Sequence, residues 1–255
     1  MKFAVLGSGS SGNAYLVEAG DTLLLIDAGF SRRELGRRLA LLDRSLDQVT
    51  ALLLTHEHSD HCSAVPQLLK RQRFPILATP GTLERLGLEG NGRIVPLDGR
   101  AVDLGDLQAR PFSVSHDAAE PVGFVFESQE GRRLGLASDL GTVTALVLHR
   151  LQECHCLALE ANHDEEKLRT GPYPFDLQRR IRSNHGHLSN AQACLALPDL
   201  LHGGLRAILP IHLSEVNNDP ILVKYGVNEI LRRQSGSDIQ CVMTSQHEVL
   251  PFREV

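Results

Sequence analysis

The segment LLLTHEHSDHCSA places several side chains that can bind a metal ion within six consecutive positions. Three histidines, His56, His58 and His61, stand with one carboxylate, Asp60, directly after an apolar run. Imidazole nitrogens together with a carboxylate oxygen suit a borderline divalent ion such as Zn²⁺, and they also admit Mn²⁺ or Fe²⁺. A polar loop that is rich in histidine by chance is the alternative, but the density of ligands favours a metal site.

The strand that ends before this segment determines where its ligands point. Leu52 to Leu54 form a buried strand end. If the chain stays extended after it, His56 and His58 point the same way, because side chains alternate along a strand, and they can share one metal. Where a helix then begins, Asp60 and His61 turn to a second direction. The segment therefore predicts two neighbouring metal ions.

The pattern H-x-H-x-D-H after a strand resembles the signature of the metallo-β-lactamase superfamily. The resemblance implies an α/β (α+β) fold, the αββα four-layer sandwich, with a two-metal centre at one edge between the sheets. It implies a first metal held by His56, His58 and His116, a second held by Asp60, His61 and His212, and a bridging Asp139. Asp27 in LLLIDAG would steady the segment from His56 to His61, the metal loop, from behind the ligands.

The positions of the remaining candidate ligands agree with these assignments. His116, Asp139 and His212 each end an apolar, strand-like run, where a polar group can emerge into a cleft. Alone, such a residue more often caps a turn; beside a four-ligand cluster it completes an incomplete site. Two bound ions lower the pKa of a bound water toward ~7 and polarise the oxygen under attack. Hydrolysis is therefore the reaction class, with Asp60 among the catalytic residues.

Two further segments bear on which bond is cleaved. LALEANHD places Glu160 after a buried strand, and SNHGHLSNAQACLAL places His187 before an amphipathic helix. The order of these two segments along the chain resembles the C-terminal half of RNase Z and the GHAS…IPVH stretches of the β-CASP nucleases, which act on phosphodiesters. The resemblance implies that His187 is the general acid or a scissile-phosphate contact and that Glu160 orients it. The alternative for His187 is a residue of the helix N-cap region, and Asn162 and His163 receive no role.

Several segments spread along the chain resemble the YycJ/WalJ (VicX) branch of the superfamily: FAVLGSGSSGNAYLVE, THEHSDH, SHDAAEPVGF, ASDLG, LEANHD, GHLSN and LPIHLSEVNND. This branch implies a two-metal phosphodiesterase that acts on DNA as a 5′-to-3′ exonuclease. The alternative is a small-molecule metallo-hydrolase of the cyclic nucleotide phosphodiesterase, thioesterase or lactonase type. A non-catalytic module is disfavoured because every ligand position holds a residue that can bind metal.

The loop GSGSSG contains G-x-G-x-x-G, the glycine pattern of dinucleotide-binding proteins. That fingerprint needs a helix at its last glycine, but NAYLVEAGDTLLLIDAG reads as two strands joined by a tight turn, so we do not predict a dinucleotide site. The backbone amides of this loop can form an anion nest instead. We therefore name Ser8, Ser10, Ser11 and Asn13 as candidate phosphate contacts, against the alternative of a tight turn between strands.

Apolar segments alternate with helical ones without a linker, so we predict a single domain over residues 1–255. Strands are expected near 2–6, 13–19, 22–27, 51–54, 76–78, 101–113, 121–127, 132–137, 155–160, 205–211 and 239–243. Helices are expected near 31–42, 65–72, 80–86, 142–151, 174–182, 189–201 and 219–234. Strand-rich stretches interleaved with amphipathic helices predict sheet layers covered by helices.

Composition restricts location and partners. No apolar run approaches the ~20 residues of a membrane-spanning helix, and the start is too short for a secretory signal. Five cysteines without framework spacing agree with a reducing compartment, so we predict a cytoplasmic protein without a membrane partner. The net charge of −5 indicates no overall attraction to DNA, although three arginine- and lysine-rich clusters can supply it locally. A homodimer is the candidate oligomeric state.

Overall fold

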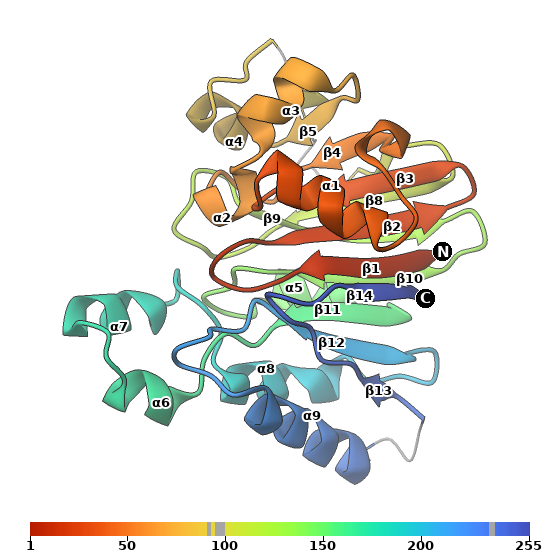
Figure 1. The fold of residues 1–255 in the computed structure, drawn as a ribbon. Coiled ribbons are helices and arrows are strands. Elements are labelled where there is room, and N and C mark those ends of the chain that lie inside the picture. Colours follow the sequence, from red (N-terminus) through yellow and green to blue (C-terminus); the bar gives the residue numbers. More distant parts are fainter. Residues whose placement is uncertain (91–92, 95–99, 235–237) are drawn as a thin grey trace.

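Two mixed sheets of seven strands each stack face to face in the computed structural model, and helices cover both outer faces (Figure 1). The structure describes residues 1–90, 93–94, 100–234 and 238–255. The first and last residues lie side by side, because the Val255 amide donates to the Met1 carbonyl at 3.0 Å. This arrangement is the αββα sandwich that the sequence predicted.

The strand order of each sheet follows the chain closely. In the first sheet the strands are, in spatial order, β14 (Leu250–Glu254), β1 (Lys2–Gly7), β2 (Ala14–Ala19), β3 (Thr22–Ile26), β4 (Ala51–Leu53), β5 (Ile76–Ala78) and β6 (Arg93–Ile94). In the second they are β13 (Gln240–Cys241), β12 (Ala207–Ile211), β11 (Cys156–Glu160), β10 (Arg133–Ala137), β9 (Val122–Ser128), β8 (Leu107–Ser113) and β7 (Val102–Asp103).

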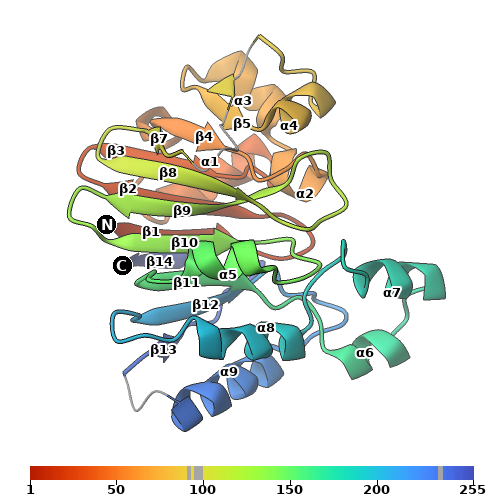
Figure 2. The ribbon, with the colours of Figure 1, turned by 180° about the vertical axis from the view of Figure 1, so that it is seen from behind.

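The helices among the described residues fall into three groups. Four belong to the N-terminal half: α1 (Arg32–Ala40), α2 (Ser59–Cys62), α3 (Val65–Arg71) and α4 (Pro80–Arg85). Three pack on the second sheet: α5 (Ala145–Leu151), α8 (Asn190–Ala196) and α9 (Pro220–Gln234). The remaining two, α6 (Glu165–Thr170) and α7 (Phe175–Ile181), project at one end of the molecule, as both views show (Figure 2). Short 3₁₀ turns span Leu46–Gln48 and Leu197–Asp199.

Alternating side chains explain why the layers stack. Along β3, Leu24 and Ile26 face the second sheet, whereas Leu23 and Leu25 face the helices. Both faces of the strand are therefore buried, which agrees with its continuous apolar run. The space between the sheets is filled largely by apolar side chains of both, including Phe3, Phe124 and Phe126.

The parallel strands direct the candidate site residues to one edge. β3, β4, β5 and β6 pair in parallel, as do β10, β11, β12 and β13. Asp27, His56, Asp139 and His212 follow the carboxyl ends of β3, β4, β10 and β12, and Glu160 ends β11. Because carboxyl ends of parallel strands meet at one edge of a sheet, residues distant in sequence come together between the two sheets.

Most predicted elements occur near the predicted positions, with five differences. The strand expected over 101–113 is a hairpin of β7 and β8, because the chain turns at Gly105, whose φ is 85°. The helix expected over 189–201 is shorter than predicted. α8 ends at Ala196, and a 3₁₀ turn that contains Pro198 follows it. Sequence analysis missed α6 and the strands β6 and β14, which are short or polar. Among the helices that the structure describes, none combines the length and apolar character needed to cross a membrane.

Candidate metal centre

Three of the site residues adopt a backbone conformation that residues other than glycine rarely take. Asp27, Asp139 and His212 have φ values of 58°, 57° and 56° at the ends of their strands. Such a left-handed residue costs about 1–3 kcal/mol and persists when the surrounding structure determines it, often at functional sites. The bend turns each side chain out of the strand direction and into the space between the sheets.

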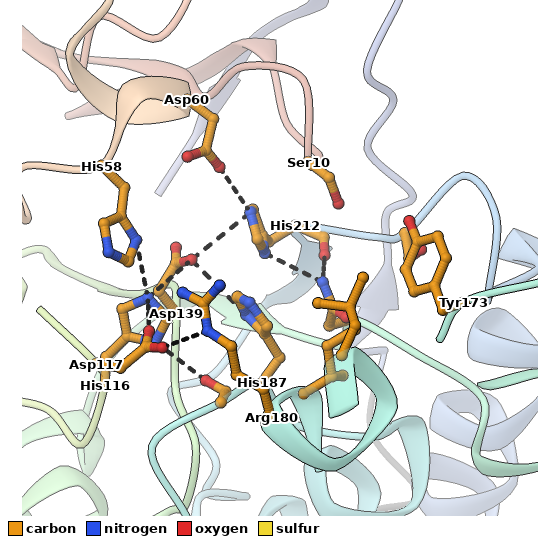
Figure 3. Close-up of a pocket in the computed structure, with 15 residues that line it drawn as sticks. Ser10, His58, Asp60, His116, Asp117, Asp139, Tyr173, Arg180, His187 and His212 are labelled. Carbon is orange, nitrogen blue, oxygen red and sulfur yellow. Dashed lines mark hydrogen bonds and ion pairs between the residues drawn. The ribbon is translucent and has the colours of Figure 1, made fainter. Parts of the chain in front are cut away.

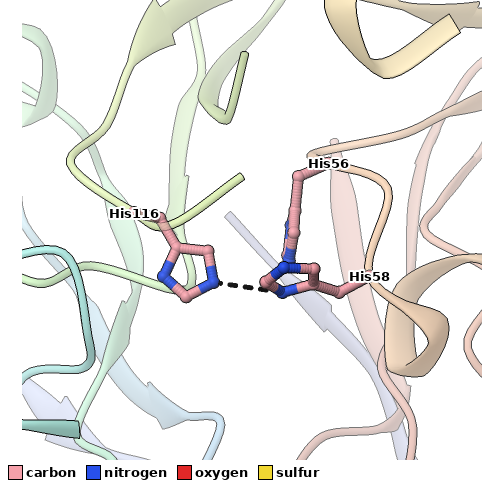
Figure 4. Close-up of side chains that lie close together, drawn as sticks. All are labelled: His56, His58 and His116. Atoms are coloured by element: carbon pink, nitrogen blue, oxygen red, sulfur yellow. Dashed lines mark hydrogen bonds between the residues drawn. The ribbon is translucent and has the colours of Figure 1, made fainter. Parts of the chain in front are cut away.

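Three histidines converge from two elements in a first cluster (Figure 4). His56 and His58 come from the loop after β4, and His116 comes from the loop between β8 and β9; one ring nitrogen of each lies within 4.8 Å of the others. His116 Nδ1 lies 3.0 Å from the Gly186 carbonyl, which leaves Nε2 free to face His58. His56 Nε2 is buried and has no hydrogen-bond partner. A cation on that nitrogen would account for its otherwise unfavourable burial.

A second cluster lies beside the first. It consists of Asp60, His61, Asp139 and His212, whose ligand atoms also lie within 4.8 Å of one another. His61 Nε2 lies 3.1 Å from Asp139 Oδ2, and His212 Nε2 lies 3.4 Å from Asp60 Oδ2. Asp139 Oδ1 is 3.8 Å from His116 Nε2, so this carboxylate contacts both clusters. The structure thus brings together all the ligands that the sequence predicted.

Hydrogen bonds behind the ligands fix the orientation of their rings. His61 Nδ1 lies 2.8 Å from Asp27 Oδ2, and Asp27 Oδ1 accepts the Thr55 amide at 2.8 Å. His212 Nδ1 lies 2.9 Å from Glu160 Oε1. A carboxylate that accepts Nδ1–H leaves Nε2 unprotonated for a metal, which is the usual arrangement behind metal-binding histidines. Asp27 lies behind the metal loop, where the sequence placed it.

The charges of the cluster favour a bound cation. Burial lowers the pKa of His212, yet the charge of Asp139 and hydrogen bonds with Asp60 and Glu160 raise it to about 10. Burial likewise lowers the pKa of His61, but Asp139 and Asp27 raise it well above the ordinary value. The carboxylates therefore hold protons on imidazoles that would otherwise be neutral. A divalent ion would satisfy the same carboxylates by replacing those protons, so the residues present fit two divalent metal ions.

Glu160 and His187 form a contact at the rim of the second cluster. His187 Nδ1 lies 2.8 Å from Glu160 Oε1, and the fully buried Glu160 also accepts the amides of Leu140 and Leu188 through Oε2. Burial raises the pKa of Glu160, but the charge of His187 and the hydrogen bonds of both imidazoles lower it to about 2. The N-cap of α8 is Ser189.

The glycine loop does not form the anion nest that the sequence suggested. The amides of Ser8, Gly9, Ser11, Gly12 and Asn13 donate to acceptors within the protein: Ser245 O, Asn13 Oδ1, Gln246 Oε1, Gly9 O and Asp60 O. The side chains of Ser8 and Asn13 are buried and hydrogen-bond each other. Of the four candidate phosphate contacts, Ser10 lines the cavity beside the clusters. The loop instead supports the site, since Ser8 Oγ accepts the His212 amide at 2.8 Å.

Several residues at the site make contacts that sequence analysis did not assign to them. Asn13 Nδ2 lies 3.1 Å from His61 Nε2, and Asn162 Nδ2 donates to the His212 carbonyl at 2.9 Å. His163 is buried, pairs its backbone with Ser189 and is not among the residues that line the cavity. The Asp-Ala-Gly sequence after β3 could have indicated a close approach of the metal loop. A Cβ on Gly29 would lie 1.7 Å from the Asp60 carbonyl oxygen, so the metal loop passes directly over this glycine.

A cavity opens over both clusters (Figure 3). One side of it carries metal-ligand candidates and His187, and the other carries residues of α7 and the segment before it. Arg180 of α7 stands at this cavity and pairs with Asp117, its Nε lying 2.5 Å from Asp117 Oδ2. One wall of the cavity is therefore polar and carries the candidate metal ligands, and the other wall is formed by the projecting helices.

Comparison with known proteins supplies a family and a set of relatives. The model of the beta-lactamase superfamily domain matches residues 22–213. The chain is 34% identical over 242 residues to exodeoxyribonuclease YycJ of Bacillus anthracis, with 92% of this chain and 90% of that protein covered. It is 32% identical to exodeoxyribonuclease WalJ of Streptococcus pneumoniae strain D39, with 100% and 98% covered. The fold is similar to Zn²⁺-bound PqqB from Methylobacterium extorquens, with a TM-score of 0.71 at 18% identity and coverage of 98% and 99%.

Proposed function

Because this chain belongs to the metallo-β-lactamase superfamily, in its YycJ/WalJ-like branch, we propose that it is a metal-dependent phosphodiesterase that degrades DNA from its ends. Two relatives aligned over nearly their full length are named exodeoxyribonucleases. The observation that carries the proposal is the contact of His187 with Glu160 beside the ligand clusters, at 2.8 Å. Such a pair supplies a proton donor for the leaving oxygen of a phosphodiester.

The metal ions would be held by the residues of the two clusters. His56, His58 and His116 would bind the first ion, Asp60, His61 and His212 the second, and Asp139 both. When bound, such a pair activates water and stabilises the charge that develops on the phosphate. The donor set of imidazoles and carboxylates suits Zn²⁺ or Mn²⁺, with Fe²⁺ admissible.

His187 is the residue that we assign to proton transfer. Its Nδ1–H points to Glu160, so Nε2 is the ring nitrogen that remains for substrate at the cavity. The buried Glu160 carboxylate accepts the Nδ1–H of His187, which keeps the ring from rotating. A protonated His187 would hydrogen-bond the scissile phosphate and then donate to the leaving oxygen.

We further propose that degradation runs 5′-to-3′ and that the protein acts in the cytoplasm on DNA, as the branch resemblance implies. Arg180 lines the cavity, where it is paired with Asp117, in a chain whose net charge is −5. The homodimer stays a prediction.

A nuclease assay tests the function directly. Zinc- or manganese-loaded protein is incubated with single-stranded, nicked and duplex DNA labelled at the 5′ or the 3′ end, and with bis-p-nitrophenyl phosphate. We expect early release of the 5′ label as a mononucleotide. Asp60→Ala should be inactive, and His149→Ala, at an exposed position on α5, should match the parent. Cleavage of bis-p-nitrophenyl phosphate with every DNA left intact would contradict the exonuclease proposal and favour a small-molecule hydrolase.

A further inference from the structure

The projecting segment between β11 and α8 forms one wall of the cavity over the metal clusters (Figures 1 and 3). Within this segment, α7 and the residues just before it contribute Tyr173, Leu177, Arg180 and Ile181. Leu177 and Ile181 lie on the same face of α7, four residues apart, and Tyr173 precedes the helix by two residues. An aromatic ring and two aliphatic side chains therefore face a cavity whose opposite wall consists of imidazoles and carboxylates.

Tyr173 is held in place by the chain around it. It stands between Pro172 and Pro174, and Pro174 is the N-cap of α7. Pro174 restricts the backbone of Tyr173 to extended conformations and Pro172 fixes its own φ, so the backbone that carries the ring loses little freedom when a ligand packs on it. The ring is half-buried and lines the cavity.

The wall is tied closely to the first metal cluster. The Gly186 carbonyl accepts from His116 Nδ1 at 3.0 Å, and a Cβ on Gly186 would lie 2.2 Å from the Ile181 carbonyl oxygen. The end of α7 thus rests directly on the loop that orients a candidate ligand. Asp117, next to His116, fixes the same helix through its ion pair with Arg180. The distance between the apolar wall and the clusters is therefore set by the fold.

We propose that Tyr173, Leu177 and Ile181 form the subsite for the nucleobase of the 5′-terminal nucleotide, whose 3′-linked scissile phosphate lies at the metal clusters; this rests on the proposed function. A nucleobase is flat and aromatic, and it stacks on a tyrosine ring without regard to sequence. Leu177 and Ile181 provide apolar contact beside the ring. The subsite takes an unpaired base, so a frayed or single-stranded end is a better substrate than a blunt duplex end.

Binding of two matched ligands tests the subsite without turnover. Thymidine 3′-monophosphate and 1,2-dideoxyribose 3-phosphate carry the same phosphate, but only the first carries a base. On the metal-loaded protein we expect the nucleotide to bind about tenfold more tightly by calorimetry, as expected for stacking of one base. Tyr173→Ala should abolish the difference and Tyr173→Phe should retain it. Tyr225→Ala, the same change at an exposed position of α9 outside the cavity, is the matched control and should leave it unchanged.

The outcomes separate this inference from the proposed function. Equal affinity for the two ligands in the parent protein, or an undiminished preference in Tyr173→Ala, would overturn the subsite. A second measurement uses single-stranded oligonucleotides whose terminal residue is either thymidine or an abasic tetrahydrofuran, placed at the 5′ or the 3′ end. Degradation of both at equal rates refutes the subsite and leaves the nuclease standing. Degradation of neither refutes the nuclease and, with it, the assignment of this wall to a DNA end.

Discussion

Replacing Glu160 by glutamine tests the hydrogen bonds that support the second cluster. The buried carboxylate accepts four hydrogen bonds, two from the imidazoles of His187 and His212 and two from backbone amides. The oxygen of a glutamine side chain can accept hydrogen bonds from either the two imidazoles or the two amides. Its NH₂ group, itself a donor, then faces the other pair of donors. Two buried donors then lose their acceptor at about 1–3 kcal/mol each, so Glu160→Gln should destabilise the fold by about 2–6 kcal/mol.

The same substitution should also change the metal content. If the amide nitrogen faces the two imidazoles, their protons move from Nδ1 to Nε2, which is the atom that His212 would offer to a metal. Thermal unfolding of the chelator-treated protein should show a Tm lowered by about 5–20 °C, at ~2–4 °C per kcal/mol for a chain of this size. Zinc content by mass spectrometry should fall below two ions per chain.

The control for this experiment is Glu130→Gln, the same change at an exposed position in the turn after β9. It should alter neither the Tm nor the zinc content. A Glu160→Gln protein with the parent Tm and two zinc ions would refute the assignment of Glu160 as the acceptor that fixes both rings.

Three other substitutions probe separate parts of the site. Asp60→Ala should lose one of the two ions and most turnover, measured by metal analysis and DNA degradation; full activity with one ion per chain would contradict the two-cluster arrangement. His187→Ala should keep both ions and slow cleavage by ~10²-fold or more, as loss of a general acid does, whereas a fall in metal content would make His187 a ligand. Gly29→Ala should weaken zinc binding measured by competition with a chelator, because its Cβ would lie 1.7 Å from the Asp60 carbonyl oxygen; unchanged affinity would mean that the metal loop can shift.

The candidate ligands could be located because the sequence carries their signals locally. His56 to His61 form a contiguous motif, and the other candidate ligands follow apolar runs that form strands of the two mixed sheets. Asp27 was placed behind the metal loop by resemblance, and its contact with His61 agrees with that placement. A candidate functional residue that directly follows a strand can therefore be located from the sequence.

The features of the site that sequence analysis missed depend on contacts between segments that are distant in the sequence. The glycine loop looked available for a phosphate because its amides seemed unpaired, yet Gln246, 235 residues further on, accepts the Ser11 amide. Asn162 and Gly186 act through hydrogen bonds to His212 and His116 that no spacing rule reveals. The short helix α6 and the polar strand β14 gave no periodic signal, although β14 closes the first sheet beside β1.

Anomalous diffraction from crystals of the zinc-loaded protein tests the central claim most directly, that these residues hold two metal ions. We predict two zinc peaks in the cavity, one bound by His56 Nε2, His58 Nδ1 and His116 Nε2 and the other by Asp60, His61 and His212, with Asp139 in contact with both. A single peak, or zinc bound elsewhere with His56 Nε2 left without a ligand, would contradict the account.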